Sequence, residues 1–98
     1  MENKELLVSF PLHCIRDMYE FRFEGVEPAI DDVLQETGNG ICDYGFCDEE
    51  VLNMIAYVNE ADLAVKAITK TLRELQTKHQ FEFSIWNSVN GVKKECLL

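Results

Sequence analysis

The sequence predicts an α+β fold of the ferredoxin-like class, an antiparallel sheet with two helices on one face. Stretches in which apolar and polar residues alternate, typical of half-buried strands, are interrupted by two stretches with the period of an amphipathic helix. From residue 18 to residue 86 their order is β-α-β-β-α-β, with an extra N-terminal strand before it. The chain has 98 residues, of which 47% are apolar and 28% charged. This length and composition are typical of a single domain covering residues 1–98.

The first two predicted strands are residues 6–12 and residues 19–23. In the first, apolar residues alternate with others, and Pro11, which has no N–H group to donate, indicates an edge strand or the end of a strand. In the second, aromatic residues alternate with charged ones, which predicts the first core strand. A rival interpretation makes residues 6–12 the first core strand and residues 13–24 an insertion. The regular aromatic alternation favours the first interpretation.

A short helix is expected to begin near Pro28, because the first helical turn tolerates proline. Ile30 and Leu34 follow at the spacing of one helical face, and acidic residues fall on the other face. Gly38 or Gly40 supplies the C-terminal stop. The sequence therefore predicts a helix with an acidic outer surface.

The next two strands are expected to form a hairpin. Cys42, Tyr44 and Phe46 alternate with other residues, which predicts a strand with these three side chains on one face. Residues 51–58 are an almost continuous apolar run, typical of a central strand. The polar turn at residues 48–50 is short enough to join the two strands directly.

The second helix is the strongest prediction in the chain. Apolar residues recur every three or four positions from Ala61 to Leu75. Asn59 is expected to be the N-cap, with an acid three residues later as in a capping box. A strand over residues 81–86 follows, and after an Asn-Gly turn signal residues 92–98 form a further edge strand or a tail.

Charge is unevenly distributed along the chain. Residues 1–22 hold four acids and three bases, residues 23–65 eleven acids and no base, and residues 66–98 three acids and six bases. The formal net charge of −9 argues against a nucleic-acid partner, which needs clustered lysine and arginine, and against an anionic membrane surface. Because there is no apolar run of bilayer length and no signal-peptide start, we expect the protein in the cytoplasm.

No motif in the sequence names a reaction, and we expect a protein that is not an enzyme and has no cofactor or metal. A cysteine nucleophile needs an imidazole or another cation beside it, and nothing in the sequence brings His13 or His79 to a particular cysteine. The closely spaced thiolate pairs of zinc sites are missing. The cysteines are therefore expected to be reduced thiols that behave as small buried hydrophobes. They are Cys14, Cys42, Cys47 and Cys96.

Two aromatic residues are candidates for binding. In the predicted fold one face of the sheet is free of helices. Trp86 or Tyr57 would be a binding or dimerisation residue if it lies on that face, and a core residue otherwise.

In size and acidic composition the chain resembles the small immunity proteins that bacteria encode beside secreted nuclease or contact-dependent toxins. The resemblance implies tight one-to-one binding of a basic toxin, which blocks the site that would otherwise take RNA or DNA. An acidic surface also attracts a cationic partner on physical grounds alone. The residues expected to contact the partner are eight acids and one aromatic anchor: Glu27, Asp31, Asp32, Glu36, Asp43, Tyr44, Asp48, Glu49 and Glu50.

The alternative is an ACT-like regulatory module, a homodimer in which sheets pair between protomers and a small molecule lies at the interface. The oligomeric state discriminates the two hypotheses. The acylphosphatase family shares the predicted topology and chain length, but its function depends on a glycine-rich phosphate loop with an arginine near the N-terminus. Residues 6–24 have no equivalent, so this enzymatic activity is not expected.

Overall fold

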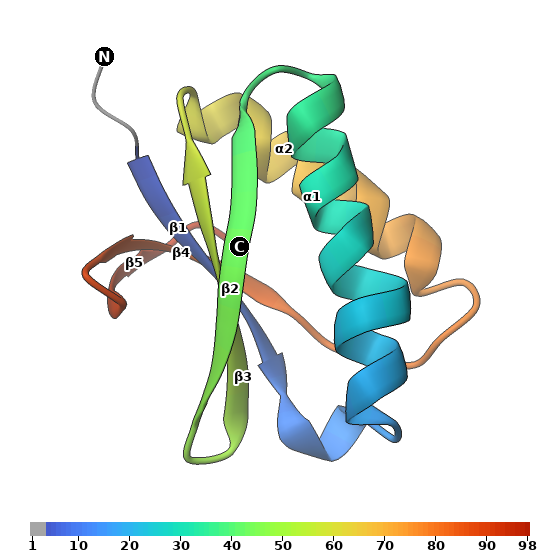
Figure 1. Ribbon diagram of the computed structural model, residues 1–98. Coiled ribbons are helices and arrows are strands. Elements are labelled where there is room, and N and C mark those ends of the chain that lie inside the picture. Colours follow the sequence, from blue (N-terminus) through green and yellow to red (C-terminus); the bar gives the residue numbers. More distant parts are fainter. Residues whose placement is uncertain (1–3) are drawn as a thin grey trace.

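The computed structural model describes residues 4–98, except for the side chains of residues 23 and 44. These residues form an α+β architecture, with one five-stranded antiparallel sheet in the order β2-β3-β1-β4-β5 and two α-helices on one of its faces (Figure 1). The strands are β1 (Lys4–Pro11), β2 (Gly40–Asp48), β3 (Val51–Val58), β4 (Ser84–Val89) and β5 (Val92–Cys96). The α-helices are α1 (Val26–Glu36) and α2 (Ala61–Leu75).

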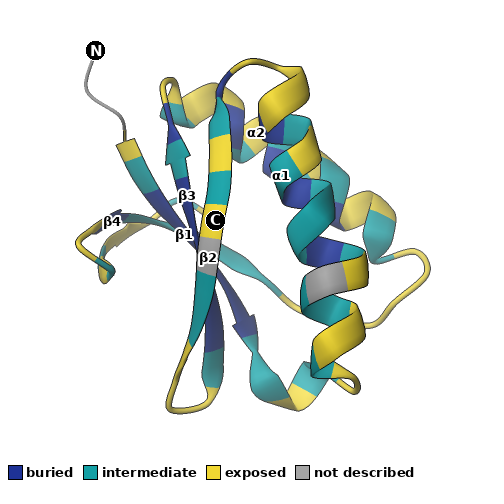
Figure 2. Cartoon of the chain, in the orientation of Figure 1, coloured by how far each residue is buried: buried dark blue, intermediate teal, exposed yellow. Residues whose placement is uncertain are grey.

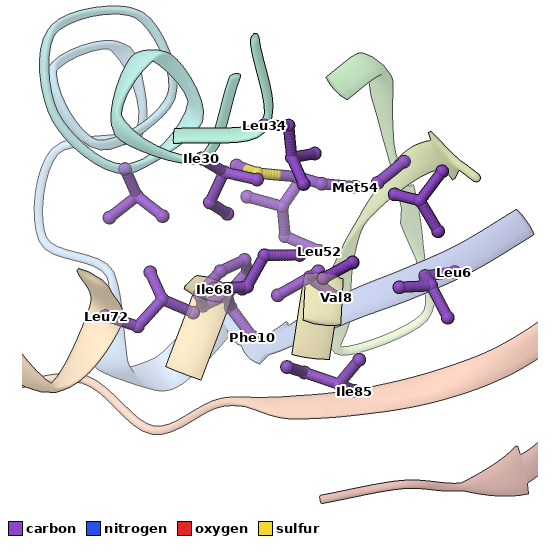
Figure 3. Close-up of a cluster of buried hydrophobic side chains, with 14 of the residues drawn as sticks. Leu6, Val8, Phe10, Ile30, Leu34, Leu52, Met54, Ile68, Leu72 and Ile85 are labelled. Atoms are coloured by element: carbon purple, nitrogen blue, oxygen red, sulfur yellow. The ribbon is translucent and has the colours of Figure 1, made fainter. Parts of the chain in front are cut away.

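The main core lies between the sheet and the two helices. Alternate residues of β1 and β3 point toward the helices, and each helix contributes apolar residues one turn apart, as a helical face requires (Figure 3). Each such side chain contributes about 1.5–3 kcal/mol when it is fully buried. Figure 2 shows the result, with buried residues along the central strands and the inner helix faces and exposed residues on the outer helix faces.

The strand predicted at residues 19–23 is wrong. Residues 18–25 are helical and lead directly into α1, with Glu20–Gly25 wound as a π-helix. The N–H of Phe21 donates to the carbonyl of Asp17 at 3.0 Å. The Phe21 ring packs edge-on against the ring of Phe10, with 5.0 Å between centroids. Since β3 and β4 occupy both sides of β1, this segment has no place beside it in the sheet.

The predicted element order therefore shifts along the chain. Residues 6–12 belong largely to β1, the first and central core strand, as the rival interpretation expected. The predicted extra strand at the N-terminus is wrong, and the additional strand is β5, at the C-terminal side of the sheet.

A β-bulge interrupts β2. The register between β2 and β3 shifts between residues 42 and 44 and leaves Asp43 without a partner. As a result Cys42 pairs with Ala56 on the helix-covered face, whereas Phe46 pairs with Asn53 on the opposite face. The predicted common face for Cys42, Tyr44 and Phe46 is therefore wrong, because Cys42 and Phe46 lie on opposite faces of the sheet. The Tyr44 side chain lies outside the described part of the chain.

Asn39 ties two connections of the fold together. Its buried side chain accepts the N–H groups of Asn59 and Glu60 at 3.1 and 2.8 Å and donates to the carbonyl of Glu60 at 2.9 Å. The predicted N-cap Asn59 is wrong, because α2 has Glu60 at that position and no side-chain cap bond of its own. Gly38, with φ of 67°, ends α1 as expected.

The β4–β5 hairpin curls onto the helix-free face, the face of the sheet opposite the two helices (Figure 1). A Cβ atom at Gly91, in the hairpin turn, would lie 3.8 Å from the ring of Phe46 on the opposite edge strand. The carboxylate of Glu5 accepts the Ser88 hydroxyl and the N–H of Gly91, the latter at 2.9 Å. The turn is thereby fastened to β1.

A second, smaller apolar layer results on the helix-free face. Leu7 and Ile55 point to this face by register, yet they are only 1% and 2% exposed. Trp86 pairs with Leu7, and Tyr57 pairs with Glu5, so both candidate aromatics lie on the helix-free face. Both are half-buried, which makes them part of a partly covered surface rather than an open one.

Candidate functional site

The sheet order converts the uneven charge of the chain into an uneven charge of the molecule. Residues 23–65, which hold no base, include α1, β2, β3 and the start of α2; β2 is an edge strand of the sheet and β3 is its neighbour. We call α1, β2 and the turn at residues 48–50 the acidic half. The later bases lie on α2, in the loop after it and on β5: Lys66, Lys70, Arg73, Lys78, Lys93 and Lys94.

Within the acidic half, three predicted site residues gather around the thiol of Cys42. Asp31 accepts the Cys42 N–H at 2.9 Å and the side-chain amide of Gln35 at 2.6 Å. Burial, and then the charges of Glu27, Asp31 and Asp43, raise the pKa of Cys42 to about 12. The thiol is therefore neutral near pH 7, which makes it a poor nucleophile.

Two of these acids are occupied inside the molecule. Glu27 is half-buried, and its Oε2 lies 3.6 Å from the Nε of Arg22. Asp31 is half-buried and joins α1 to β2 through the hydrogen bond to Cys42. Both residues therefore have a structural role that an acidic count along the sequence does not reveal.

The remaining acids of α1 point elsewhere. Asp32 and Glu36 are exposed and lie roughly 100° and 140° around the helix from Asp31. Because Asp31 faces β2, these two side chains point away from the strand and into solvent. Within the described part of the chain, neither makes an ion pair within 4 Å.

The third group is the turn between β2 and β3. Asp48, Glu49 and Glu50 are all exposed, and Glu49 has φ of 53°. The carbonyl of Glu50 accepts the N–H of Leu12 at 2.9 Å, which anchors the turn to the end of β1. β2 separates this turn from the end of α1 (Figure 1), a distance of roughly 30 Å at about 3.3 Å per residue. The predicted residues therefore form three groups on one half of the molecule rather than one patch.

A cleft that was not predicted from the sequence lies at the end of the sheet. It has a volume of about 570 Å³ and lies between the connection from β1 to α1 and the connection from α2 to β4. Its walls combine apolar, acidic and basic side chains, among them Cys14, Arg16, Glu20, Phe21, Lys78, His79 and Phe81. The two connections are far apart in sequence, and the first was expected to be a strand, so no local pattern indicated the cleft.

A cluster of donor side chains stands beside this cleft. Ligand atoms of His13, Cys14 and Glu82 lie within 4.8 Å of one another. His13 and Cys14 are neighbours in the sequence, and Glu82, from a distant part of the chain, completes the set. Glu82 comes close to the other two residues through the antiparallel register of β1 with β4. The periodicity of the sequence does not specify this register.

No family model matches the chain, and comparison with curated proteins and with solved structures likewise finds no match. Across residues 4–98, no helix is both long enough and apolar enough to cross a membrane.

Proposed function

We propose that this protein binds and neutralises a basic protein partner through its acidic half, in the manner of the small immunity proteins of nuclease toxins. The supporting observation is the fold at the β2 edge of the sheet, where α1, β2 and the turn after it carry eight of the eleven acids of the base-free segment 23–65. A surface of one sign raises the encounter rate with a partner of the opposite sign and selects against partners of the same sign. The proposal assigns no catalytic role to the acidic half, in which burial and nearby carboxylates raise the pKa of the Cys42 thiol.

The contacting residues in this proposal are the exposed carboxylates of the acidic half. They are Asp32, Glu36, Asp43, Asp48, Glu49 and Glu50. Glu27 and Asp31 support them by holding the helix and the strand in place. An interface of standard size covers about 800 Å² on each partner and is roughly 30 Å across. One partner is therefore large enough to reach from Asp43 to the turn at residues 48–50.

A nuclease is the favoured class of partner because it must carry clustered lysine and arginine to hold phosphates. Carboxylates spaced along an edge strand and its turn present alternative partners for those cations. Once its lysine and arginine side chains were covered in the cytoplasm, the nuclease could no longer bind its nucleic-acid substrate. The proposal is one of occlusion and needs no chemical step.

We also infer that the architecture is ferredoxin-like with β5 added at one edge. In that topology each helix crosses over one inserted strand. Here β3 lies between β1 and β2, and β1 lies between β3 and β4.

The alternative, a regulatory homodimer of the ACT-like kind, has one observation in its favour. Val89 and Val92, in the hairpin at the β5 side of the sheet, are each 55% exposed. A second copy that extended the sheet there would bury them. Sedimentation of the purified protein discriminates the two, because this alternative requires a stable homodimer and the first proposal a monomer that becomes a one-to-one complex.

The test is charge reversal combined with partner capture. The protein is used as bait in an extract of its organism of origin, the captured protein is identified, and its affinity is then measured with purified components. Asp48→Lys/Glu50→Lys and Asp32→Lys/Glu36→Lys are expected to weaken binding by at least about 100-fold, mostly through slower association at low salt. Asp31 is left unchanged because its loss would disturb β2.

The matched control is Glu74→Lys/Glu95→Lys. It makes the same change in net charge with two exposed residues outside the acidic half. Binding close to that of the unaltered protein supports the proposal. Capture of no basic protein, or equal weakening by all three double variants, would overturn it.

A further inference from the structure

We propose that His13, Cys14 and Glu82 form a binding site for a divalent transition-metal cation of the zinc type. Their ligand atoms, one nitrogen, one sulfur and one oxygen, lie within 4.8 Å of one another. None of these residues belongs to the acidic half, so the site stands independently of the proposed function. The expectation that all four cysteines are buried is wrong for Cys47 and Cys96, which are exposed. Cys14 is half-buried, and this proposal makes it a metal ligand.

The fold builds this site from the register of two neighbouring strands. β1 and β4 pair with Val8 opposite Ile85 and Ser9 opposite Ser84. The same antiparallel register, extended by two residues, sets Pro11 opposite Glu82. Immediately after Pro11 the chain turns into a short 3-10 helix, Leu12–Cys14, which carries the other two donors.

The turn that carries His13 and Cys14 is held by backbone hydrogen bonds. The N–H of Leu12 donates to the carbonyl of Glu50 at 2.9 Å, and the N–H of Ile15 donates to the carbonyl of Leu12 at 3.0 Å. Two donors therefore come from one fixed turn, and the third comes from the extended segment that enters β4. Such an arrangement presents the donors with little backbone freedom left to lose.

The three side chains have no other assigned partner. Within residues 4–98, none of them makes a side-chain hydrogen bond or an ion pair within 4 Å. Among residues 4–98, no lysine or arginine lies within 4 Å of the Glu82 carboxylate, although Arg73 lines the same surface cleft. A cation would supply the missing charge.

The donor types determine the class of metal. Zinc accepts imidazole nitrogen, thiolate sulfur and carboxylate oxygen, whereas calcium and magnesium bind oxygen ligands. Donors around a tetrahedral zinc ion, at bond lengths of about 2.0–2.3 Å, lie roughly 3.3–3.8 Å apart. His13 and Glu82 are exposed and Cys14 is half-buried, so rotations of the two exposed side chains bring the set to that spacing.

Three protein ligands leave a fourth position for water or for another ligand. Cys14 also lines the 570 Å³ cleft, so the metal would stand at the rim of that cleft. A bound ion would in addition join the connection after β1 to the segment before β4. Metal binding to the folded state alone therefore raises the melting temperature.

The test is titration of the full chain with Zn²⁺, and with Co²⁺ as a spectroscopic probe, in the presence of a non-thiol reductant. We expect one tightly bound ion per chain and a thiolate-to-cobalt charge-transfer absorption in the near ultraviolet. His13→Ala, Cys14→Ser and Glu82→Gln are each expected to weaken Zn²⁺ binding by at least about tenfold. Saturating Zn²⁺ is expected to raise the melting temperature by at least about 5 °C, and a chelator to reverse the shift.

The matched controls are Cys47→Ser and Glu74→Gln, which alter exposed residues of two of the three donor types outside both the cluster and the cleft. Each should bind Zn²⁺ like the unaltered protein. Since His13 and Glu82 are exposed, their variants are expected to fold, which circular dichroism checks. Absence of the cobalt–thiolate band, or Zn²⁺ affinity that is the same in His13→Ala and Glu82→Gln as in the controls, would overturn the proposal and assign binding to surface carboxylates.

Discussion

The backbone groups at the outer edges of the two edge strands, β2 and β5, are protected in different ways. β2 runs beside α1, and side chains of the helical segment reach its edge: Asp31 accepts the N–H of Cys42, and the guanidinium of Arg22 donates to the carbonyl of Gly45 at 3.4 Å. β5 has five residues and no helix beside it, and three of its side chains are charged. Short length and exposed charge are the usual protection of such an edge against pairing with another chain.

Two acids, Asp31 on α1 and Glu5 on the central strand β1, hold the two edge regions in place through different contacts. Asp31, in the acidic half, completes the hydrogen bonding of an edge strand. Glu5, in β1, fastens the β4–β5 turn. Both carboxylates are already engaged in hydrogen bonds within the protein, so a count of carboxylates overstates the number available for binding a partner.

The largest expected difference between the edges concerns glycine. A Cβ atom at Gly40, the first residue of β2, would lie 1.9 Å from the carbonyl oxygen of Tyr57, so Gly40→Ala must push β2 away from β3. We expect a loss of about 3 kcal/mol or more in the free energy of unfolding. At the β5 side, Gly91→Ala meets nothing closer than 3.8 Å and pays mainly for its φ of 79°, about 1–2 kcal/mol. Urea unfolding measures both, and equal losses would show that the close contact at β2 is relieved without cost.

The second expected difference concerns the cysteines. At pH 8, Cys42 in β2 is expected to react with iodoacetamide at least about 100-fold more slowly than the exposed Cys96 in β5, because its pKa is raised to about 12. Mass spectrometry of the alkylated peptides measures the two rates.

The same pKa predicts the direction of a pH effect on stability. The folded-state pKa of Cys42 lies above its usual value of 9.0, so the neutral thiol favours folding fully below pH 9, and this contribution is lost as the pH rises toward 12. Cys42→Ala should weaken that alkaline loss, whereas Cys96→Ala should leave it unchanged. Similar alkylation rates for the two thiols would contradict the prediction.

The smallest expected difference concerns the two fastening acids. Asp31→Ala leaves the N–H of Cys42 without its acceptor and is expected to cost about 1–2 kcal/mol, with faster hydrogen exchange at that amide. Asp31→Asn keeps a side-chain oxygen and should cost less. Glu5→Ala is expected to cost a similar amount but to speed exchange at Gly91 instead. Faster exchange at both sites in either variant would mean that the two edges are not independent.

Much of the fold could be predicted from the sequence where a periodic pattern was long enough to identify an element without knowledge of the elements that it packs against. β3 was predicted with the observed bounds, and α2 within a residue of them, because their apolar periodicities extend over eight and fifteen residues. The strand predicted at residues 19–23 was wrong because an alternation of only three aromatic residues is also compatible with a helical segment. The choice depended on which strands flank β1, a long-range fact that no local pattern contains.

The candidate site was less predictable than the fold. The acids were visible in the sequence, but the bulge at Asp43 and the bond from Asp31 to β2 depend on register and packing. The approach of Glu82 to Cys14 depends on the pairing of the first strand with the fourth. Such distant pairs are set by the whole sheet and leave no mark on the local sequence.

The central position of β1 has a consequence for the order in which the protein is made. β1 is the first strand to be synthesised, but it pairs with β3 and β4, and the hairpin fastened to its Glu5 ends at residue 96. During translation the apolar residues of β1 therefore remain unpaired on one side until β4, residues 84–89, has been made. Contacts so far apart in the chain slow folding and prolong the exposure of a sticky strand. A ribosome-bound chain that ends before residue 84 should depend on chaperones more than the 98-residue chain does.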